Sequence, residues 1–168
     1  TIRSINQSLI DRIVSRGGMV KNLHGQKNLY YQVNATYYSA LGESDEKMLL
    51  ARAIQMFMPG KPQIWYLDLF AGKKDHEAVQ RSGESGHKEI NRTNLSTDQI
   101  TEGLKKDVVQ KQLALIRMRN THKAFSEGAE VAISGGERTL EIRREYNSAF
   151  ATLYVNFESG TYTIVESR

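Results

Sequence analysis

Hydrophobic positions in the first part of the chain recur at helical spacing. Between residues 5 and 15 they form one stripe, made by Ile5, Leu9, Ile10, Ile13 and Val14, which predicts an amphipathic helix. Between residues 46 and 58 the sequence is apolar nearly all round, which is typical of a helix enclosed by other elements. Ser44 or Asp45 precedes this helix and can cap its start.

Short apolar segments separate the predicted helices. Residues 29–34 are aromatic and β-branched and predict a strand, whereas residues 16–28 contain three glycines and predict an exposed loop. Residues 62–70, PQIWYLDLF, form a continuous apolar run after a Pro-Gly turn, which is typical of a parallel strand buried on both faces. A helix, a tight turn and a buried strand in succession form the repeating step of an α/β protein.

A long polar segment follows this predicted strand and extends from Gly72 to about Ser96. Loops that leave the carboxyl ends of parallel strands carry the functional sites of α/β enzymes, so we expect this segment to contribute to a site. The residues that follow it, 97–122, predict a further helix, with Ser96 or Thr97 as its cap.

The pattern changes to a period of two from Ala129 onward. Four segments, EVAIS, TLEIRREY, SAFATLYVNF and TYTIV, are separated by the short turn signals GGE, NS and ESG. They predict an antiparallel meander of about four strands. The chain is therefore predicted to combine α/β architecture over residues 1–125 with a small all-β domain over residues 126–168.

Composition narrows the class of protein. The 168 residues carry a net charge of +4, with lysine and arginine spread along the chain, so no basic block indicates nucleic-acid binding. Cysteine is absent, which excludes disulfides and thiolate metal sites and favours a cytoplasmic location. No apolar run approaches the roughly 20 residues of a membrane-spanning helix. Because the chain begins at Thr1 with no lead-in to its first helix, we expect it to be part of a longer protein.

Two clusters carry candidate chemistry, and each has two interpretations. Four tyrosines at 30, 31, 37 and 38 surround Gln32 and Asn34. They are either partly buried residues with satisfied hydroxyls or part of a sugar-facing surface. The segment SGESGHKEINRTN is either a solvated charged loop or an anion- or sugar-binding lid with Lys88 or Arg92 directed inward. The four histidines share no metal-ligand spacing, so a zinc site is not expected.

Three stretches resemble a known family. YYQVNATYYSALGESDEKMLLARAIQMFMPGKPQIWYLDLFAGKKD, then KEINR, then DVVQKQLALIRMRNTHKAF, occur in the order and near the spacing of the sucrose phosphorylases. These are α-glucosyl phosphorylases of the alpha-amylase superfamily, glycoside hydrolase family 13. The resemblance is strong over residues 29–125 and weak in the flanks.

The resemblance implies a fold and a reaction. Family members are (β/α)8 barrels with a C-terminal antiparallel β domain, so residues 1–125 would be the last helices and the eighth strand of the barrel. They convert a glucoside and phosphate into α-glucose 1-phosphate by a retaining double displacement that needs no cofactor or metal. Their catalytic aspartate, glutamate and second aspartate lie upstream of the matching segment. The resemblance therefore implies no catalytic residue in this chain, which should be inactive alone.

Acceptor-side binding residues do carry over by resemblance. Tyr31 matches a tyrosine of a mobile loop that helps to hold phosphate, and Gln32 matches a glutamine that contacts the acceptor. The family's Gly-Arg-Asp pattern before INR is replaced by His87, Lys88 and Glu89. Lys88 keeps the positive charge but loses the planar two-pronged donor of arginine.

This departure leaves the acceptor open. Sucrose, sucrose 6-phosphate, glucosylglycerol and glucosylglycerate are the candidate glucosides, with inorganic phosphate as the second substrate. Neither nucleic acid nor a membrane is an expected partner, and a homodimer is implied by resemblance alone. A different class of protein also fits the pattern, namely a non-catalytic carbohydrate-binding β module at residues 126–168 with a helical preface.

Overall fold

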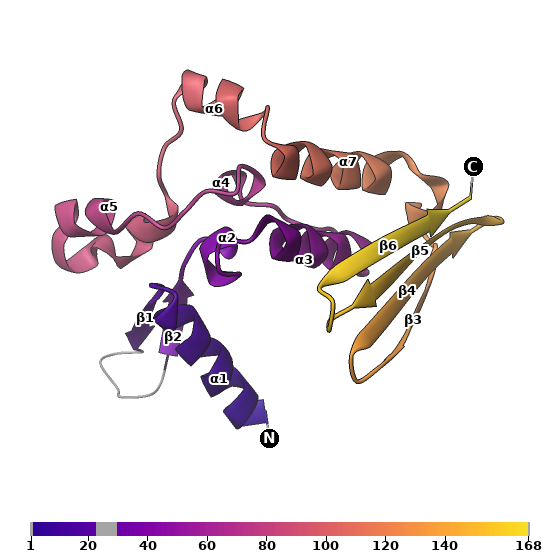
Figure 1. Ribbon diagram of the computed structural model, residues 1–168, viewed down its shortest axis with the longest axis horizontal. Helices are drawn as coiled ribbons and strands as arrows, with labels where there is room; N and C mark the ends of the chain where they lie inside the picture. The colour runs from indigo at the N-terminus through magenta and orange to yellow at the C-terminus, as the bar shows by residue number, and fades with distance from the viewer. Residues whose placement is uncertain (1, 23–29, 168) are drawn as a thin grey trace. The chain divides into compact units, whose positions relative to one another are not determined.

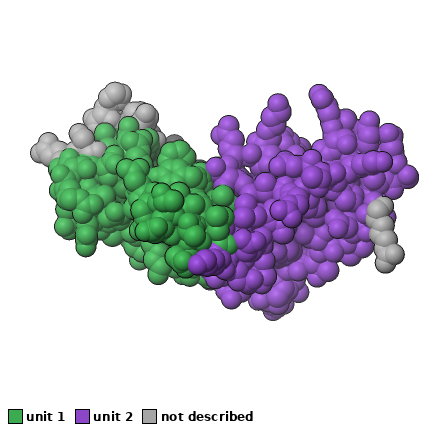
Figure 2. Space-filling view, turned by 90° about the horizontal axis from the view of Figure 1, so that it is seen from above, with its two compact units in different colours: residues 1–44, 65–104 green, residues 45–64, 105–168 purple. Residues whose placement is uncertain are grey.

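A computed structural model describes residues 2–22 and 30–167, without the side chains of residues 2–4, 30, 31, 84 and 85. The chain divides into two compact units, which Figure 2 distinguishes by colour. Unit 1 contains residues 1–44 and 65–104, and unit 2 contains residues 45–64 and 105–168. Each unit thus combines two separate stretches of the sequence.

Unit 1 is made of short helices and one two-stranded ribbon. Its elements are α1 (Ile2–Ser15), β1 (Met19–Asn22), β2 (Tyr30–Asn34), α2 (Tyr37–Ala40), α4 (Tyr66–Leu69), α5 (His76–Arg81), the 3-10 helix η2 (Gly83–Asn91) and α6 (Thr97–Gly103). Strands β1 and β2 pair antiparallel, with Met19 opposite Asn34 and Lys21 opposite Gln32. The predicted strand at residues 29–34 is confirmed as β2. Its partner β1 lies in the segment predicted to be a loop.

Helix α1 forms where the hydrophobic stripe predicts it. Much of that stripe is nevertheless exposed, with Ile5 at 62%, Leu9 at 55% and Val14 at 43% of their accessible surface. The periodicity therefore predicts the helix correctly, while the described residues of unit 1 do not cover its apolar face.

The strand predicted at residues 62–70 is wrong. Residues 61–65 lack regular structure and Tyr66–Leu69 form α4, with Trp65 extended at φ −70° and ψ 137° as its N-cap. A parallel strand is defined by hydrogen bonds to a neighbouring strand. The part of the chain that the structure describes forms only the β1–β2 ribbon and one antiparallel sheet, so no parallel neighbour is present there. The eighth strand of a barrel accordingly stays a prediction from the resemblance.

The polar segment after α4 is more regular than its composition suggests. Asp75 caps α5 by accepting a hydrogen bond from the Ala78 amide at 2.8 Å, and η2 follows directly. The single helix predicted at residues 97–122 is two helices, α6 and α7 (Asp107–Thr121). Ser96 caps α6 in a reciprocal capping box with Gln99, as the sequence predicts.

Unit 2 packs two helices against one sheet. Its elements are α3 (Asp45–Phe57), α7, the 3-10 helix η3 (Lys123–Phe125) and the strands β3 (Glu130–Gly136), β4 (Thr139–Tyr146), β5 (Ala149–Asn156) and β6 (Thr161–Glu166). The strands form an antiparallel meander in the order β3-β4-β5-β6, which confirms the predicted four-stranded module (Figure 1). Leu50, Ala53, Met56 and Phe57 of α3 share a buried core with Ile142 and Leu153 of the sheet.

Buried polar contacts fix α3 within unit 2. Nε of Arg52 donates to Oε1 of Gln112 on α7 at 2.9 Å, and both side chains are fully buried. At the other end of α3, Arg119 donates to the Met56 carbonyl at 3.0 Å and Arg144 donates to the Phe57 carbonyl at 3.2 Å. The last carbonyls of a helix lack intrahelical donors, so these two cations stabilise its C-terminus.

Candidate functional site

A polar cavity in unit 1 brings three separate segments together. It has a volume of about 240 Å³ and is lined by Gln32, Asn34, Trp65, Lys88, Asn91 and Arg92. Strand β2 supplies the first two residues, the N-cap of α4 supplies the third, and η2 with the residue after it supplies the rest. The predicted site residues Gln32 and Lys88 therefore line one cavity.

Two carboxamides enter this cavity from β2. Gln32 and Asn34 are two positions apart, so a strand places them on the same face. Oε1 of Gln32 and Nδ2 of Asn34 are both buried and have no hydrogen-bond partner among the described residues. Only 7% of Asn34 is exposed. A buried polar group that lacks a partner costs about 1–3 kcal/mol, so this acceptor and this donor are suited to a polar ligand.

The side of the cavity formed by η2 is positively charged. Lys88 and Arg92 line it, and Arg92 forms a long 3.6 Å ion pair with Glu89. His87, next to them, has a lowered pKa because its ring is buried and because Lys21, Lys88 and Arg92 surround it with positive charge. His87 is accordingly a neutral side chain at neutral pH, and Nε2 of its ring is buried without a partner among the described residues. The local charge favours an anionic group in the cavity.

The indole of Trp65 forms an aromatic wall of the cavity and is held by a hydrogen bond and by a ring contact. Its Nε1 donates to the Asn91 carbonyl at 3.0 Å, and its ring lies 4.9 Å from that of Tyr66. The Tyr66 hydroxyl in turn donates to the Thr93 carbonyl at 2.8 Å. Trp65 is 49% exposed, so a face of the indole remains accessible beside the amides. An aromatic face beside amides and cations can hold a sugar ring and orient its hydroxyl or phosphoryl groups.

The other predicted residues have different outcomes. Tyr31 lies in β2 between Tyr30 and Gln32, which pair with Asn22 and Lys21. The register shifts at this point, so Tyr31 is not one of the paired positions. Its side chain lies outside the described residues. Tyr37 is 38% exposed and, like Tyr38, is not among the residues that line the cavity. Arg92, one of two cations in the lid hypothesis, does line it.

The sequence pattern does not indicate Trp65 as a site residue. The apolar run at residues 62–70 predicts a buried strand, in which the indole would be a core side chain. The available signal was that it is the single tryptophan of the chain and follows the helix-breaking PGKP turn.

Other kinds of site find no support in the part of the chain that is described. Residues 2–22 and 30–167 contain no group of three histidines and carboxylates able to hold a metal ion. None of the helices formed by these residues has the length and apolar character required to cross a membrane.

Comparisons with known proteins show what the chain as a whole is similar to. No family model matches the chain. The chain is 50% identical over 161 residues to a sucrose 6(F)-phosphate phosphorylase of Ilumatobacter coccineus, covering 94% of this chain and 31% of that protein. It is 42% identical to a sucrose phosphorylase of Agrobacterium vitis, covering 82% of this chain and 28% of that protein.

A solved structure shows the same fold. The crystal structure of sucrose 6F-phosphate phosphorylase from Thermoanaerobacter thermosaccharolyticum superposes with a TM-score of 0.89 at 36% identity, covering 96% of this chain and 32% of that one. The chain thus spans about a third of the length of the proteins that it matches. These similarities identify it as sucrose phosphorylase-like, corresponding to the C-terminal portion of such a protein.

Proposed function

We propose that the chain is the acceptor-side portion of a retaining α-glucosyl phosphorylase that converts sucrose or a related glucoside and phosphate into α-glucose 1-phosphate. The observation that carries this proposal is the cavity lined by both Gln32 and Lys88, in which two buried amide groups without a partner among the described residues accompany two cations. The similarity to phosphorylases over nearly the whole chain supports the same assignment.

The residues of the cavity have distinct roles in this proposal. Gln32 Oε1 accepts a hydrogen bond from a hydroxyl of the acceptor sugar, and Asn34 Nδ2 donates one to it. The Trp65 ring packs against the apolar face of the sugar. Lys88 and Arg92 attract phosphate, and Lys88 does so as a point charge without the bidentate geometry of arginine. Tyr31 is assigned to phosphate binding by resemblance.

The reacting carboxylates are assigned to the rest of the enzyme. Within the described residues, the cavity is lined by amides, cations and an indole, and by no carboxylate. Retaining glycoside chemistry requires a nucleophilic carboxylate and a second carboxyl group as acid and base. In the proposed reaction the nucleophile forms a bond to the anomeric carbon while the acid protonates the departing acceptor oxygen. A phosphate oxygen then attacks that carbon, releases the carboxylate and gives its proton to the base.

Sucrose 6-phosphate is the second candidate substrate. It is favoured by the pair of cations in the cavity, since one can neutralise a phosphoryl group on the acceptor while the other attracts inorganic phosphate. The names of the two sucrose 6-phosphate phosphorylases among the similar proteins favour it as well. Glucosylglycerol and glucosylglycerate carry smaller acceptors that would leave this cavity less filled.

The decisive experiment measures phosphate-dependent release of glucose 1-phosphate by the full-length protein. Sucrose, sucrose 6-phosphate, glucosylglycerol and glucosylglycerate are supplied in turn. We expect activity on sucrose or sucrose 6-phosphate, and we expect Lys88→Ala to weaken the use of the phosphorylated substrate by about tenfold or more. Lys61→Ala, which removes an exposed lysine outside the cavity, is the matched control. Absence of glucose 1-phosphate with every glucoside would overturn the proposal.

The cytoplasmic location and the homodimer stay predictions from the sequence. The alternative of a carbohydrate-binding β module without catalysis would be favoured if the full-length protein bound saccharides but released no product.

A further inference from the structure

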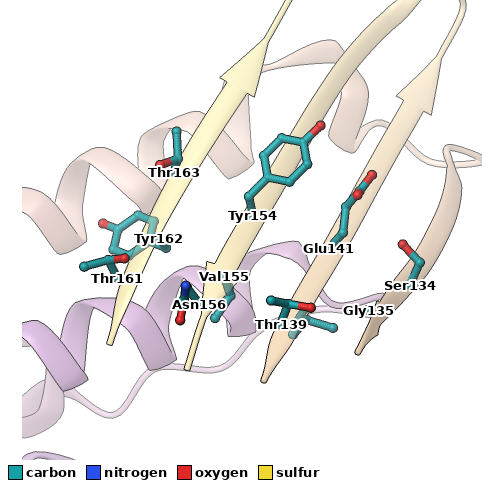
Figure 3. A pocket seen from close by; sticks show the side chains of 11 residues that line it. Ser134, Gly135, Thr139, Glu141, Tyr154, Val155, Asn156, Thr161, Tyr162 and Thr163 are labelled. Carbon is teal, nitrogen blue, oxygen red and sulfur yellow. The ribbon is translucent and has the colours of Figure 1, made fainter. Parts of the chain in front are cut away.

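A second cavity lies on the sheet of unit 2. Its volume is about 410 Å³, and it is formed by all four strands near the end that carries the β3–β4 and β5–β6 turns (Figure 3). None of its lining residues belongs to the acceptor cavity of unit 1. Nothing in the proposed phosphorylase reaction uses it.

Cross-strand pairing arranges the outward side chains of this cavity in rows. Ser134 is opposite Glu141, Glu141 is opposite Tyr154, and Tyr154 is opposite Thr163, so these four residues form one row on one face. A second row, Thr139, Asn156 and Thr161, lies two residues away along the strands on the same face. Figure 3 shows the ring of Tyr154 between Glu141 and Thr163.

The residues between the two rows face the opposite side of the sheet. Leu140, Val155 and Tyr162 pack in or against the hydrophobic core, so their backbone forms the floor of the cavity. The core therefore holds the floor rigid, while the outward rows are available to a ligand. Tyr154 is 45% exposed, which is unusual for a large aromatic side chain at the centre of a sheet.

The two rows differ in how their polar groups are used. In the second row Thr139 accepts a hydrogen bond from the Gly136 amide, and Asn156 accepts from the Glu158 and Ser159 amides, so both stabilise turns. No side-chain hydrogen bond or ion pair occurs for the four residues of the first row within the described chain. The hydroxyls of Ser134 and Thr163, the hydroxyl of Tyr154 itself and the Glu141 carboxylate are therefore available to a ligand.

We propose that this cavity binds a neutral saccharide through the Tyr154 ring and the polar groups of its row. A flat ring covers the apolar face of a sugar, and flanking hydroxyls and a carboxylate bond its hydroxyl groups. The lining residues include no lysine, arginine or histidine among those described, and Glu141 adds a negative charge. An anionic ligand such as a sugar phosphate is therefore disfavoured here, in contrast to the cationic cavity of unit 1.

Four strands give the row enough length for more than one sugar ring. Neighbouring strands lie about 4.8 Å apart, so three intervals extend over roughly 14 Å. The site is therefore suited to a linear oligosaccharide that crosses the strands.

Binding to the full-length protein is tested with maltotriose and cellotriose, two neutral trisaccharides that differ in linkage, by chemical-shift titration. We expect at least one of them to shift the backbone amides of Tyr154 and Thr163. Tyr154→Ala should weaken that binding by about tenfold, because it removes the stacking ring. Phe157→Ala is the matched control, since Phe157 is a similarly exposed aromatic residue, at 49%, that does not line the cavity.

Any of these results would overturn the inference: no shift with either trisaccharide, binding that Tyr154→Ala leaves unchanged, or equal weakening by Phe157→Ala. Gln32→Ala separates this site from the phosphorylase proposal. That variant should leave trisaccharide binding at Tyr154 intact even if it impairs phosphorolysis in the full-length protein. Binding that disappears in Gln32→Ala would place the saccharide in unit 1 and refute the second site.

Discussion

The guanidinium of Arg144 lies 5.2 Å from the centre of the Phe125 ring. Arg119 lies 5.0 Å from the same centre, and the ring meets Phe57 edge-on at 5.1 Å. Burial lowers the pKa of Arg144, and the nearby charge of Arg119 lowers it further. Phe125 therefore packs against Phe57 at the end of α3 and also makes cation–π contacts with both Arg119 and Arg144.

Replacing Phe125 by alanine should destabilise the protein by about 2–4 kcal/mol, because it removes an aromatic contact and both cation–π contacts. The change is measured as the shift in the urea midpoint of unfolding. Phe157→Ala removes an exposed ring and should stay within about 0.5 kcal/mol of the original protein. Similar losses in both variants would contradict the role assigned to Phe125.

Glu43 should make stability depend on acid pH. Hydrogen bonds from Lys73 and Lys74 lower its pKa from 4.5 to about 2. Since the pKa is lower in the folded state, the stabilisation is complete above about pH 4.5 and is lost as the pH falls toward 2. For this partly exposed group the effect is on the order of 1–3 kcal/mol.

Glu43→Gln tests this dependence. The free energy of unfolding of both proteins is measured from about pH 5 down to about pH 2, because the two pKa values of Glu43 lie in this range. The variant should be less stable at pH 5 and should lose less stability on acidification. Parallel pH profiles for the two proteins would count against the Glu43 ion pairs. Glu127→Gln, at an exposed carboxylate, serves as the control.

Phosphate should raise the pKa of His87. Burial comes first among the causes that lower this pKa, followed by the charges of Lys21, Lys88 and Arg92. An anion bound beside those cations offsets their charge and favours the imidazolium. An NMR titration of the histidine ring with and without inorganic phosphate measures the shift. His122 contacts the Ser167 carbonyl in unit 2 and is the internal control, and an unmoved His87 titration would argue against an anion in the cavity.

Trp65 should contribute to acceptor binding in the full-length protein. Trp65→Leu removes the ring and the bond to Asn91, so the KM for the glucoside should rise about 5–30-fold, equivalent to 1–2 kcal/mol. Trp65→Phe keeps a ring and should recover part of that loss. A drop in kcat at unchanged KM for both variants would show that Trp65 does not hold the acceptor.

The sequence predicts elements whose pattern is local. In β4 the alternation of Leu140 and Ile142 with Glu141 and Arg143 assigns both the strand and its faces, and Ile142 is indeed fully buried. Helix α3 follows from its apolar surface, and its start at Asp45 follows from the capping residues. Propensity and burial agree in these segments, so the pattern is sufficient.

Elements defined by distant partners are predicted less well. The apolar run at residues 62–70 predicts a strand, but a strand forms only where neighbouring strands are present, and the sequence of the run does not specify them. Helix α5 was missed within the polar segment although Asp75 is a good N-cap residue. The predicted boundary at residues 125 and 126 stays a prediction, as do the roles of Tyr31, Gln32 and Lys88.

In the candidate site, some features follow from the local sequence pattern and others depend on contacts between distant segments. Gln32 and Asn34 could be placed on one strand face from the period of two, and the charge of the Lys88 segment was evident. Their meeting with Trp65 depends on how β2, α4 and η2 pack, which no single segment specifies. The resemblance to sucrose phosphorylases indicates Gln32 and Lys88 as site residues, whereas only the structure shows that Trp65 lines the same cavity.

The interleaving of the two units has a consequence for biosynthesis. Helix α3 leaves the ribosome well before the strands that bury it, because residues 65–104 belong to the other unit and are made in between. At about 5–20 residues per second, the roughly 100 residues from α3 to β5 take on the order of 5–20 s. During that interval Leu50, Met56 and Phe57 have no sheet to cover them, so nascent chains stalled before β5 should depend on chaperones to avoid aggregation.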